Sequence, residues 1–150
     1  MESLEKRIDD FFHAYEKRFN DALAGREPDV EGTSNSFSEF FVESSPVGVM
    51  GGKNNQEFKE SIPKEYAFYK SIGTQYMRIV SKKSTPLDEF HCMVKVRWTS
   101  HYEKGGLQKT IEFDVIYFLF CAHGPLKIFA YITGDEQKAL KENGLISTAR

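Results

Sequence analysis

Asp114 is the side chain best placed for acid–base chemistry in this sequence of 150 residues. It is the one charged residue between Phe113 and Phe120, a stretch of aromatic and branched side chains. Burial among apolar groups raises the pKa of a carboxyl group, and a carboxylate tuned toward neutral pH can remove a proton next to a carbonyl. On an exposed strand face, Asp114 would instead pair with Arg97 and contribute about 0–1 kcal/mol to stability. The residue types alone leave both hypotheses open.

Other reactive side chains form no recognisable catalytic or ligand-binding motif. His91, His101 and His123 lie at strand ends and in a turn, with no carboxylate or cysteine at a fixed spacing, which favours structural or solvent-facing roles. The sequence contains no C-x₂-C zinc spacing, no glycine-rich phosphate or dinucleotide loop and no G-x-S-x-G turn. We therefore predict neither a metal ion nor a cofactor.

The face on which Asp114 lies depends on the turn that joins two long predicted strands. If Gly105 and Gly106 are the central residues of a two-residue turn, Arg97 lies opposite Asp114, and Trp98 points to the other face with the apolar residues. A bulge or an odd-length loop would instead put Trp98 beside Ile116 and aim Asp114, with Phe118 and Phe120 on its own face, toward the Ser100 side. The sequence does not choose between these registers.

The first half of the chain predicts three helices and a minor strand. Apolar residues at three- and four-residue spacing predict a helix over 4–23 that stops near Gly25. A capping box predicts a short helix over 36–45, and residues 46–52 predict a minor strand. A third helix is expected over 54–73, bent or restarted at its internal proline.

The second half predicts a sheet. Segments 74–83, 89–103, 108–121 and 126–133 are rich in aromatic and β-branched residues and are separated by turn sequences. A short helix over 134–144 follows. Helices followed by strands indicate a single α+β domain over residues 1–150, with a curved antiparallel sheet of four long strands plus a minor strand wrapped around three helices.

Composition excludes several function classes. A net charge of −2 and a pI near 6.1 give no support for nucleic-acid binding. The longest apolar run, 115–122, is too short to span a membrane, and the charged first residues lack the apolar segment of a secretory signal, so we expect a cytoplasmic protein. Cys92 and Cys121 lie in apolar strands and are expected to be buried and reduced.

The order of these elements resembles the nuclear-transport-factor-2-like superfamily over nearly the whole chain. The resemblance is carried by the helix ending FFHAYEKRFNDALAG, the passage FFVESSPVGVMGG and the aromatic strands FDVIYFLFCAHGPLKIFAYITGDEQKAL. It implies a cone of sheet and helices with an interior pocket. Ketosteroid isomerases, polyketide cyclases of the SnoaL type and scytalone-dehydratase-like enzymes belong to this superfamily.

Most catalytic residues of these enzymes have no counterpart of the same type in this sequence. The position of the isomerase base corresponds to Val49, and the position of its protonated aspartate, like that of the cyclase aspartate, corresponds to Ile116. Asp114 lies two residues earlier on the same strand face and could reach such a pocket at another depth. Tyr15 resembles the hydrogen-bond-donating tyrosine of the isomerase.

These observations lead to three hypotheses for function. The first is a protein that binds a small apolar or amphipathic molecule in an interior pocket lined by Tyr15, Trp98, Phe118 and Phe120. The second is an isomerase, cyclase or dehydratase that uses Asp114, assisted by Tyr15 or a histidine, as its acid or base. The third is a structural or interaction module with no ligand.

A homodimer is expected under each hypothesis. Strand 115–121 carries apolar side chains on both faces, and three helices can cover only one of them. The superfamily resemblance implies the same dimer through the outer face of the sheet.

Overall fold

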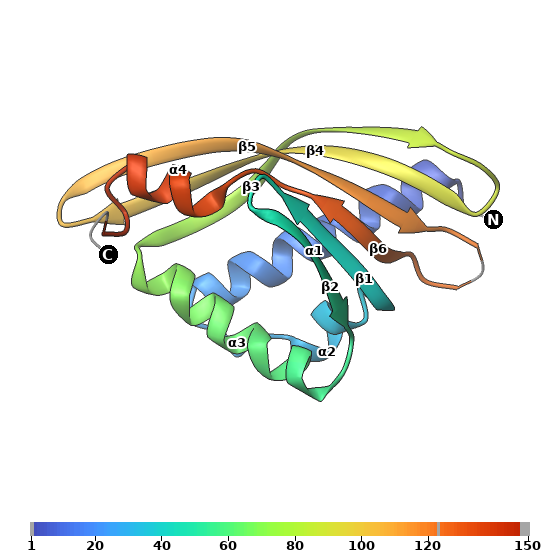
Figure 1. The fold of residues 1–150 in the computed structure, drawn as a ribbon, viewed down its shortest axis with the longest axis horizontal. Helices are drawn as coiled ribbons and strands as arrows, with labels where there is room; N and C mark the ends of the chain where they lie inside the picture. Colours follow the sequence, from blue (N-terminus) through green and yellow to red (C-terminus); the bar gives the residue numbers. More distant parts are fainter. Residues whose placement is uncertain (1, 123, 148–150) are drawn as a thin grey trace.

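The computed structural model describes residues 2–122 and 124–147, and it is built on one curved sheet of six strands in the order β2-β1-β6-β5-β4-β3 (Figure 1). The strands are β1 (Phe37–Ser45), β2 (Gly48–Lys53), β3 (Thr74–Pro86), β4 (His91–Lys104), β5 (Leu107–Phe120) and β6 (Lys127–Ile132). The helices are α1 (Leu4–Leu23), α2 (Val30–Ser34), α3 (Gln56–Ser71) and α4 (Glu136–Glu142). Helices α1 and α3 lie on the same side of the sheet, which curves over them without closing into a barrel. The predicted α+β class is confirmed.

Helix α1 forms where its apolar spacing predicts. The Ser3 side chain caps it by accepting a hydrogen bond from the Lys6 amide, and Gly25 follows its end at a φ of 94°. Its buried residues recur every three to seven positions and therefore form one stripe toward the sheet; they are Ile8, Phe12, Phe19 and Ala22.

The predicted helix over 36–45 is wrong, because this segment is strand β1. It pairs antiparallel with β2 and parallel with β6, and these ladders supply the hydrogen bonds that a short helix would have made internally. Ser36 does not cap a helix. Its Oγ instead accepts a hydrogen bond from Arg18 and donates one to the Gly32 carbonyl. The capping box is a local signal, and here tertiary pairing overrides it.

Helix α3 and the later strands follow the prediction closely. Asn55 caps α3, which continues through Pro63 without restarting and ends before Gly73, whose φ is 89°. Residues 48–53 form the expected minor strand, and the four long strands appear as β3 to β6.

The structure decides the hairpin register. Lys104 pairs with Leu107 across a turn formed by Gly105 and Gly106, whose φ angles are 58° and 83°. Both positive angles match the two-residue turn that follows the natural twist of a hairpin. Arg97 therefore lies opposite Asp114.

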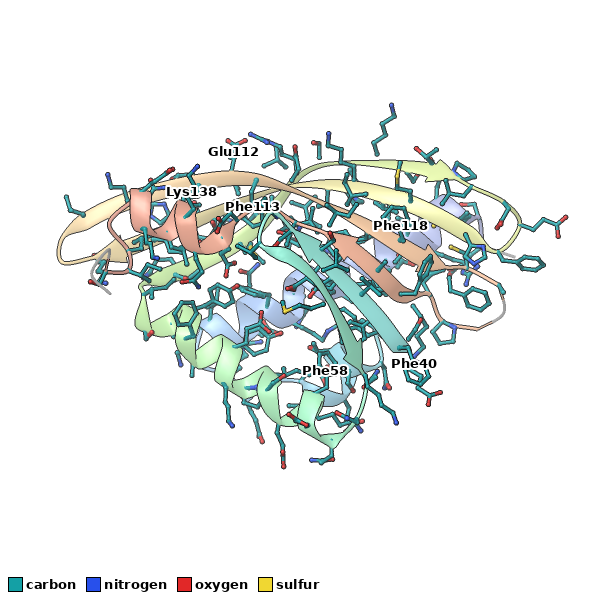
Figure 2. The ribbon with its side chains drawn as sticks, viewed as in Figure 1. Phe40, Phe58, Glu112, Phe113, Phe118 and Lys138 are labelled. Carbon is teal, nitrogen blue, oxygen red and sulfur yellow. The ribbon has the colours of Figure 1, made fainter. Side chains whose placement is uncertain are left out.

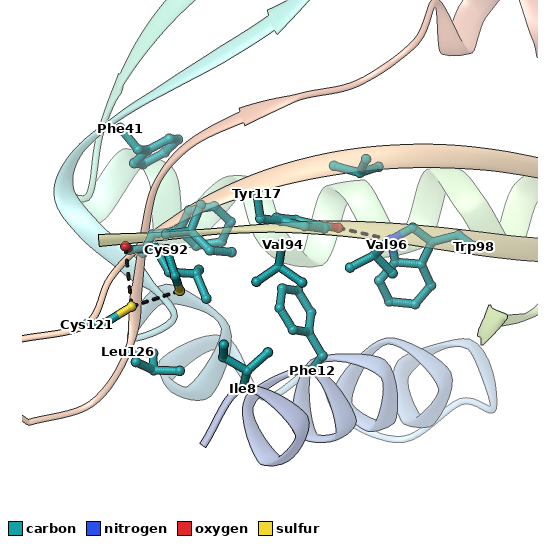
Figure 3. Close-up of a cluster of buried hydrophobic side chains, with 14 residues drawn as sticks. Ile8, Phe12, Phe41, Cys92, Val94, Val96, Trp98, Tyr117, Cys121 and Leu126 are labelled. Carbon is teal, nitrogen blue, oxygen red and sulfur yellow. Dashed lines mark hydrogen bonds between the residues drawn. The ribbon is translucent and has the colours of Figure 1, made fainter. Parts of the chain in front are cut away.

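The main core lies between α1 and the concave face of the sheet (Figure 3). Phe12 projects from α1 toward Tyr117, with ring centroids 5.0 Å apart, and Val94, Val96 and Trp98 of β4 are fully buried. Cys92 and Cys121 are both buried and free, with their Sγ atoms 2.9 Å apart. The side chains of this core therefore fill the space between the concave face and the N-terminal part of α1.

None of the helices in the described part of the chain is long and apolar enough to cross a membrane.

Candidate functional site

A cavity of about 360 Å³ lies between α1, α3 and the concave face of the sheet. The end of β1, the exposed Val47 and the segment that joins β6 to α4 also line it. The wall is rich in aromatic residues, which are Tyr15, Phe19, Phe37, Phe58, Tyr66, Tyr69, Trp98, Tyr102, Phe113, Tyr117 and Tyr131. In Figure 2, Phe113 points to the inside of β5 while its neighbour Glu112 points to the outside. The cavity is large enough for a small organic molecule.

Two carboxylates at the cavity are held by tyrosine hydroxyl groups. Tyr131 donates a hydrogen bond of 2.5 Å to Glu43 Oε1, and Tyr69 donates one of 2.6 Å to Glu136 Oε2. Burial is the main cause that raises the pKa of both tyrosines far above the ordinary value. Burial also raises the pKa of Glu136, although the Tyr69 hydrogen bond opposes that shift. These tyrosines therefore act as hydrogen-bond donors, not as bases.

Glu65 of α3 has the most perturbed carboxyl group of the cavity. Loss of hydration raises its pKa from 4.5 to about 7, and the negative charges of Glu136 and Glu43 add to the shift. The side chain borders the cavity and is solvent-exposed, although nearby protein removes part of its hydration. It makes no hydrogen bond or ion pair with another described residue. A carboxyl group with this pKa exchanges its proton near neutral pH.

Two hydroxyl groups at the cavity wall also lack partners. Tyr15 borders the cavity, and its hydroxyl has no hydrogen-bond partner among residues 2–122 and 124–147. Thr74 is 5% exposed, and its Oγ1 is buried without a partner in the same part of the chain. By contrast, the Trp98 indole N–H is satisfied, because it donates to the Tyr117 hydroxyl at 3.1 Å (Figure 3). Tyr15 and Thr74 are therefore the groups free to bond to a bound molecule.

The structure corrects the hypothesis that Asp114 faces the interior. The two-residue turn places it on the outer face of the sheet, where Arg97 donates to its Oδ1 at 3.3 Å and Lys95 lies 3.9 Å from its Oδ2. Asp114 does not border the cavity. It is a partly exposed ion-pair partner, for which a contribution of about 0–1 kcal/mol is typical.

The four predicted ligand contacts are divided between the two faces of the sheet. Tyr15 and Trp98 border the cavity, and their rings lie 6.2 Å apart. Phe118 and Phe120 alternate with the inward-facing residues of β5 and lie on the outer face. The prediction that Phe118 and Phe120 line the pocket is therefore wrong. The reason is the same as for Asp114, because the register of the hairpin sets the face of all three residues.

None of the histidines that the structure describes borders the cavity. His91 bonds to Asp88 with its Nδ1 2.8 Å from Oδ1, and His101 stacks on Tyr76. His123 lies outside the described residues. Within residues 2–122 and 124–147, no group of three or more histidine, cysteine, aspartate or glutamate side chains could hold a metal ion.

Sequence reasoning missed Glu43, Glu65 and Glu136. Glu65 follows Ile62 by three residues and precedes Tyr69 by four, so helical spacing already places it beside the apolar face of α3. Glu43 alternates with Phe41, so reading 37–45 as a strand would have turned it inward. Their proximity to Glu136 could not be read from spacing, because the three residues come from distant segments.

The chain matches one family model over most of its length. Residues 4–136 match the family described as NTF2-like protein (DUF6841). Among curated proteins, none matches the sequence.

Solved structures with the same fold cover most of the chain at low sequence identity. An NTF2-like protein of unknown function from Shewanella oneidensis is 15% identical and aligns over 89% of this chain and 100% of its own, with a TM-score of 0.64. An NTF2-like protein with a cystatin-like fold from Novosphingobium aromaticivorans is 10% identical over 95% of this chain and 88% of its own, with a TM-score of 0.65. A ketosteroid isomerase-like protein from Erwinia carotovora is 17% identical over 85% of this chain and 92% of its own, with a TM-score of 0.57. These similarities establish the shared fold.

Proposed function

We propose that this protein, which belongs to the NTF2-like family DUF6841, binds a small amphipathic organic molecule in the cavity between α1, α3 and the sheet. The observation that carries the proposal is the cavity itself: about 360 Å³, lined by aromatic side chains together with polar and charged ones. Pockets of this size and composition are typical of small-molecule sites. An interaction module filled by its own aromatic side chains would have no such space.

Binding of the neutral fluorescent dye Nile red tests this proposal. Thr133 borders the cavity, so Thr133→Trp should fill part of the space and lower the bound fluorescence. Thr99 lies on the outer face of β4, so Thr99→Trp is the matched control and should bind the dye like the wild type. Equal dye binding by both variants, or no binding by the wild type, would contradict a ligand site in this cavity.

Proton transfer is the second candidate function, with Glu65 in the role first given to Asp114. Its pKa of about 7 suits a general base at neutral pH, and the unpartnered Tyr15 hydroxyl could donate a hydrogen bond to a substrate oxygen. The reaction class would be removal of a proton next to a carbonyl. Loss of turnover in Glu65→Gln, with retained Nile red binding, would separate this role from binding alone.

We also propose a homodimer through the outer face of the sheet. Pairing between strands brings apolar side chains together across β4, β5, β6 and β1, namely Met93, Ile116, Phe118, Phe120, Phe129, Ala130, Ile132 and Val42. Phe120, Ile132 and Val42 are each about 40% exposed, although large apolar side chains are usually covered. A second copy of the chain would cover this surface in a symmetric interface.

A further inference from the structure

The charged groups at the cavity are strongly unbalanced. Four carboxyl groups border it, from Glu43, Glu65, Asp135 and Glu136, and Arg18 is the one cationic side chain among its described lining residues. Arg18 donates to Ser36 Oγ at 2.6 Å and lies 5.8 Å from the centre of the Tyr15 ring, and its single positive charge offsets only part of the charge of four carboxylates. None of the four carboxylates forms an ion pair with a described residue. The cavity therefore has an uncompensated negative potential.

The hydrogen bonds made by the carboxylates leave Glu65 as the open acceptor. Glu43 and Glu136 each accept from a tyrosine, and Asp135 accepts from the Lys138 amide as the cap of α4. Glu65 has no such partner among the described residues. Its side chain is exposed to solvent at the cavity, so water is its present partner, and a cationic group of a ligand could replace that water without breaking a bond within the protein.

Aromatic rings line the same cavity as this carboxyl group. The charge of Glu65 is one of the causes that raise the pKa values of Tyr15, Tyr69 and Tyr131, and Tyr66 is its neighbour on α3. The faces of aromatic rings attract cations and repel anions. A positively charged group at Glu65 would thus be favoured by the carboxylate and by the tyrosine rings together.

A second, independent observation indicates a bound molecule. Thr74 is 5% exposed and borders the cavity, and its Oγ1 has no partner within the described residues. A buried hydroxyl without a hydrogen bond is costly, and a polar atom of a ligand would satisfy it. The Tyr15 hydroxyl also has no hydrogen-bond partner among the described residues, although Tyr15 is only partly buried.

We propose that the ligand of this cavity is an organic cation, a protonated amine or a quaternary ammonium group on an apolar body, with its charge at Glu65. The apolar body lies against the aromatic wall that includes Trp98 and Phe58. This inference rests on the proposed binding function and adds the chemical class of the ligand.

The proposal predicts that binding depends on pH through Glu65. The groups around it are Arg18 and Tyr15 on α1, Tyr66 and Tyr69 on α3, Glu43 on β1, Tyr131 on β6, and Asp135 and Glu136 before and in α4. Among these groups, Glu65 has a pKa raised to about 7, and burial also raises the pKa of Glu136. Between pH 8 and pH 6 its ionised fraction falls about tenfold, so the affinity for a permanent cation should fall by up to about tenfold.

Isothermal titration calorimetry with three small probes tests the inference. Benzyltrimethylammonium is a cation whose charge does not titrate, benzyl alcohol is neutral, and benzoate is an anion. At pH 8 we expect the cation to bind about tenfold more tightly than benzyl alcohol, as a charge-assisted contact with added cation–π attraction should give, and benzoate to bind most weakly.

Two variants locate the effect at Glu65. Glu65→Gln should remove both the preference for the cation and the loss of affinity between pH 8 and pH 6. Glu60→Gln changes an exposed carboxylate on the same helix, away from the cavity, and should behave like the wild type. Circular dichroism confirms that each variant is folded.

The outcomes separate this inference from the proposed function. If Thr133→Trp blocks Nile red but benzyl alcohol binds as tightly as the cation, the cavity binds ligands and the cation proposal is overturned. A cation preference that survives in Glu65→Gln would also overturn it. If neither Nile red nor any of the three probes binds, both proposals fail.

Discussion

Replacing Tyr117 with phenylalanine removes one hydroxyl group from a buried hydrogen bond that joins β4 to β5. The Trp98 indole N–H donates to this hydroxyl at 3.1 Å, Trp98 is 0% exposed and Tyr117 is 5% exposed. The change keeps the ring that packs against Phe12, so the shape of the core is preserved. What it leaves is a buried donor without an acceptor.

The size of the effect follows from that unpaired donor. A buried polar group that loses its partner costs about 1–3 kcal/mol, more than the net value of an ordinary hydrogen bond. For a domain of this length, each kcal/mol lowers the melting temperature by about 2–4 °C. We therefore expect Tyr117→Phe to lower the free energy of unfolding by about 2 kcal/mol and the melting temperature by about 4–8 °C.

Urea denaturation measures this difference directly. Trp98 is the one tryptophan in the sequence, so its fluorescence reports on the unfolding of the core, and circular dichroism provides a second signal. Tyr76→Phe is the matched control, because the Tyr76 ring stacks on His101 and its hydroxyl has no partner in the described part of the chain. A loss below about 0.5 kcal/mol in Tyr117→Phe, equal to that of the control, would refute the reasoning.

Three further predictions address the interface, the thiols and the cavity. Phe118→Asp changes the outer face and should turn the dimer into a folded monomer in analytical ultracentrifugation. Leu119 is fully buried, so Leu119→Asp should instead cost several kcal/mol of stability. A wild type that is monomeric at micromolar concentration would contradict the proposed dimer. Burial and the contact with Cys121 raise the pKa of the Cys92 thiol, so iodoacetamide should label it only after denaturation, and rapid labelling of the native protein would be inconsistent with this burial. Because the pKa of Glu65 is raised in the folded state, the wild type loses stability as pH rises from about 4.5 through about 7, and the advantage of Glu65→Gln should therefore appear above pH 7 and vanish near pH 4. A gain that is equal at both pH values would show that charge is not its cause.

Much of the fold could be predicted from the sequence. The positions and approximate lengths of α1, α3 and the strands β3 to β6 follow from residue spacing and turn residues, because those signals act between near neighbours in the chain. The alternation in β5 also indicated that both of its faces are apolar. The reduced state of Cys92 and Cys121 and the cytoplasmic location stay predictions.

The tertiary structure decided three features that local patterns leave open. The segment 37–45 carries phenylalanines whose four-residue spacing fits a helix or a strand, and the choice came from pairing with β2 and β6. The register around Gly105 and Gly106 depends on which turn the two strands can close, and a shift of one residue reverses every side chain in them. That register moved Asp114 to the outer face and kept Trp98 inside.

The composition of the candidate site also depends on the tertiary structure. Glu43, Glu65 and Glu136 lie on β1, α3 and α4, and they meet only because the sheet curves over α3 and brings the end of β6 back to the same rim. Spacing along a sequence records which residues share one face of one element, and it carries no information on which faces meet. The residue pattern of the chain therefore determined an aromatic-rich sheet packed on helices, while the folded chain determined that the carboxyl groups at its cavity are those of Glu43, Glu65, Asp135 and Glu136 and not that of Asp114.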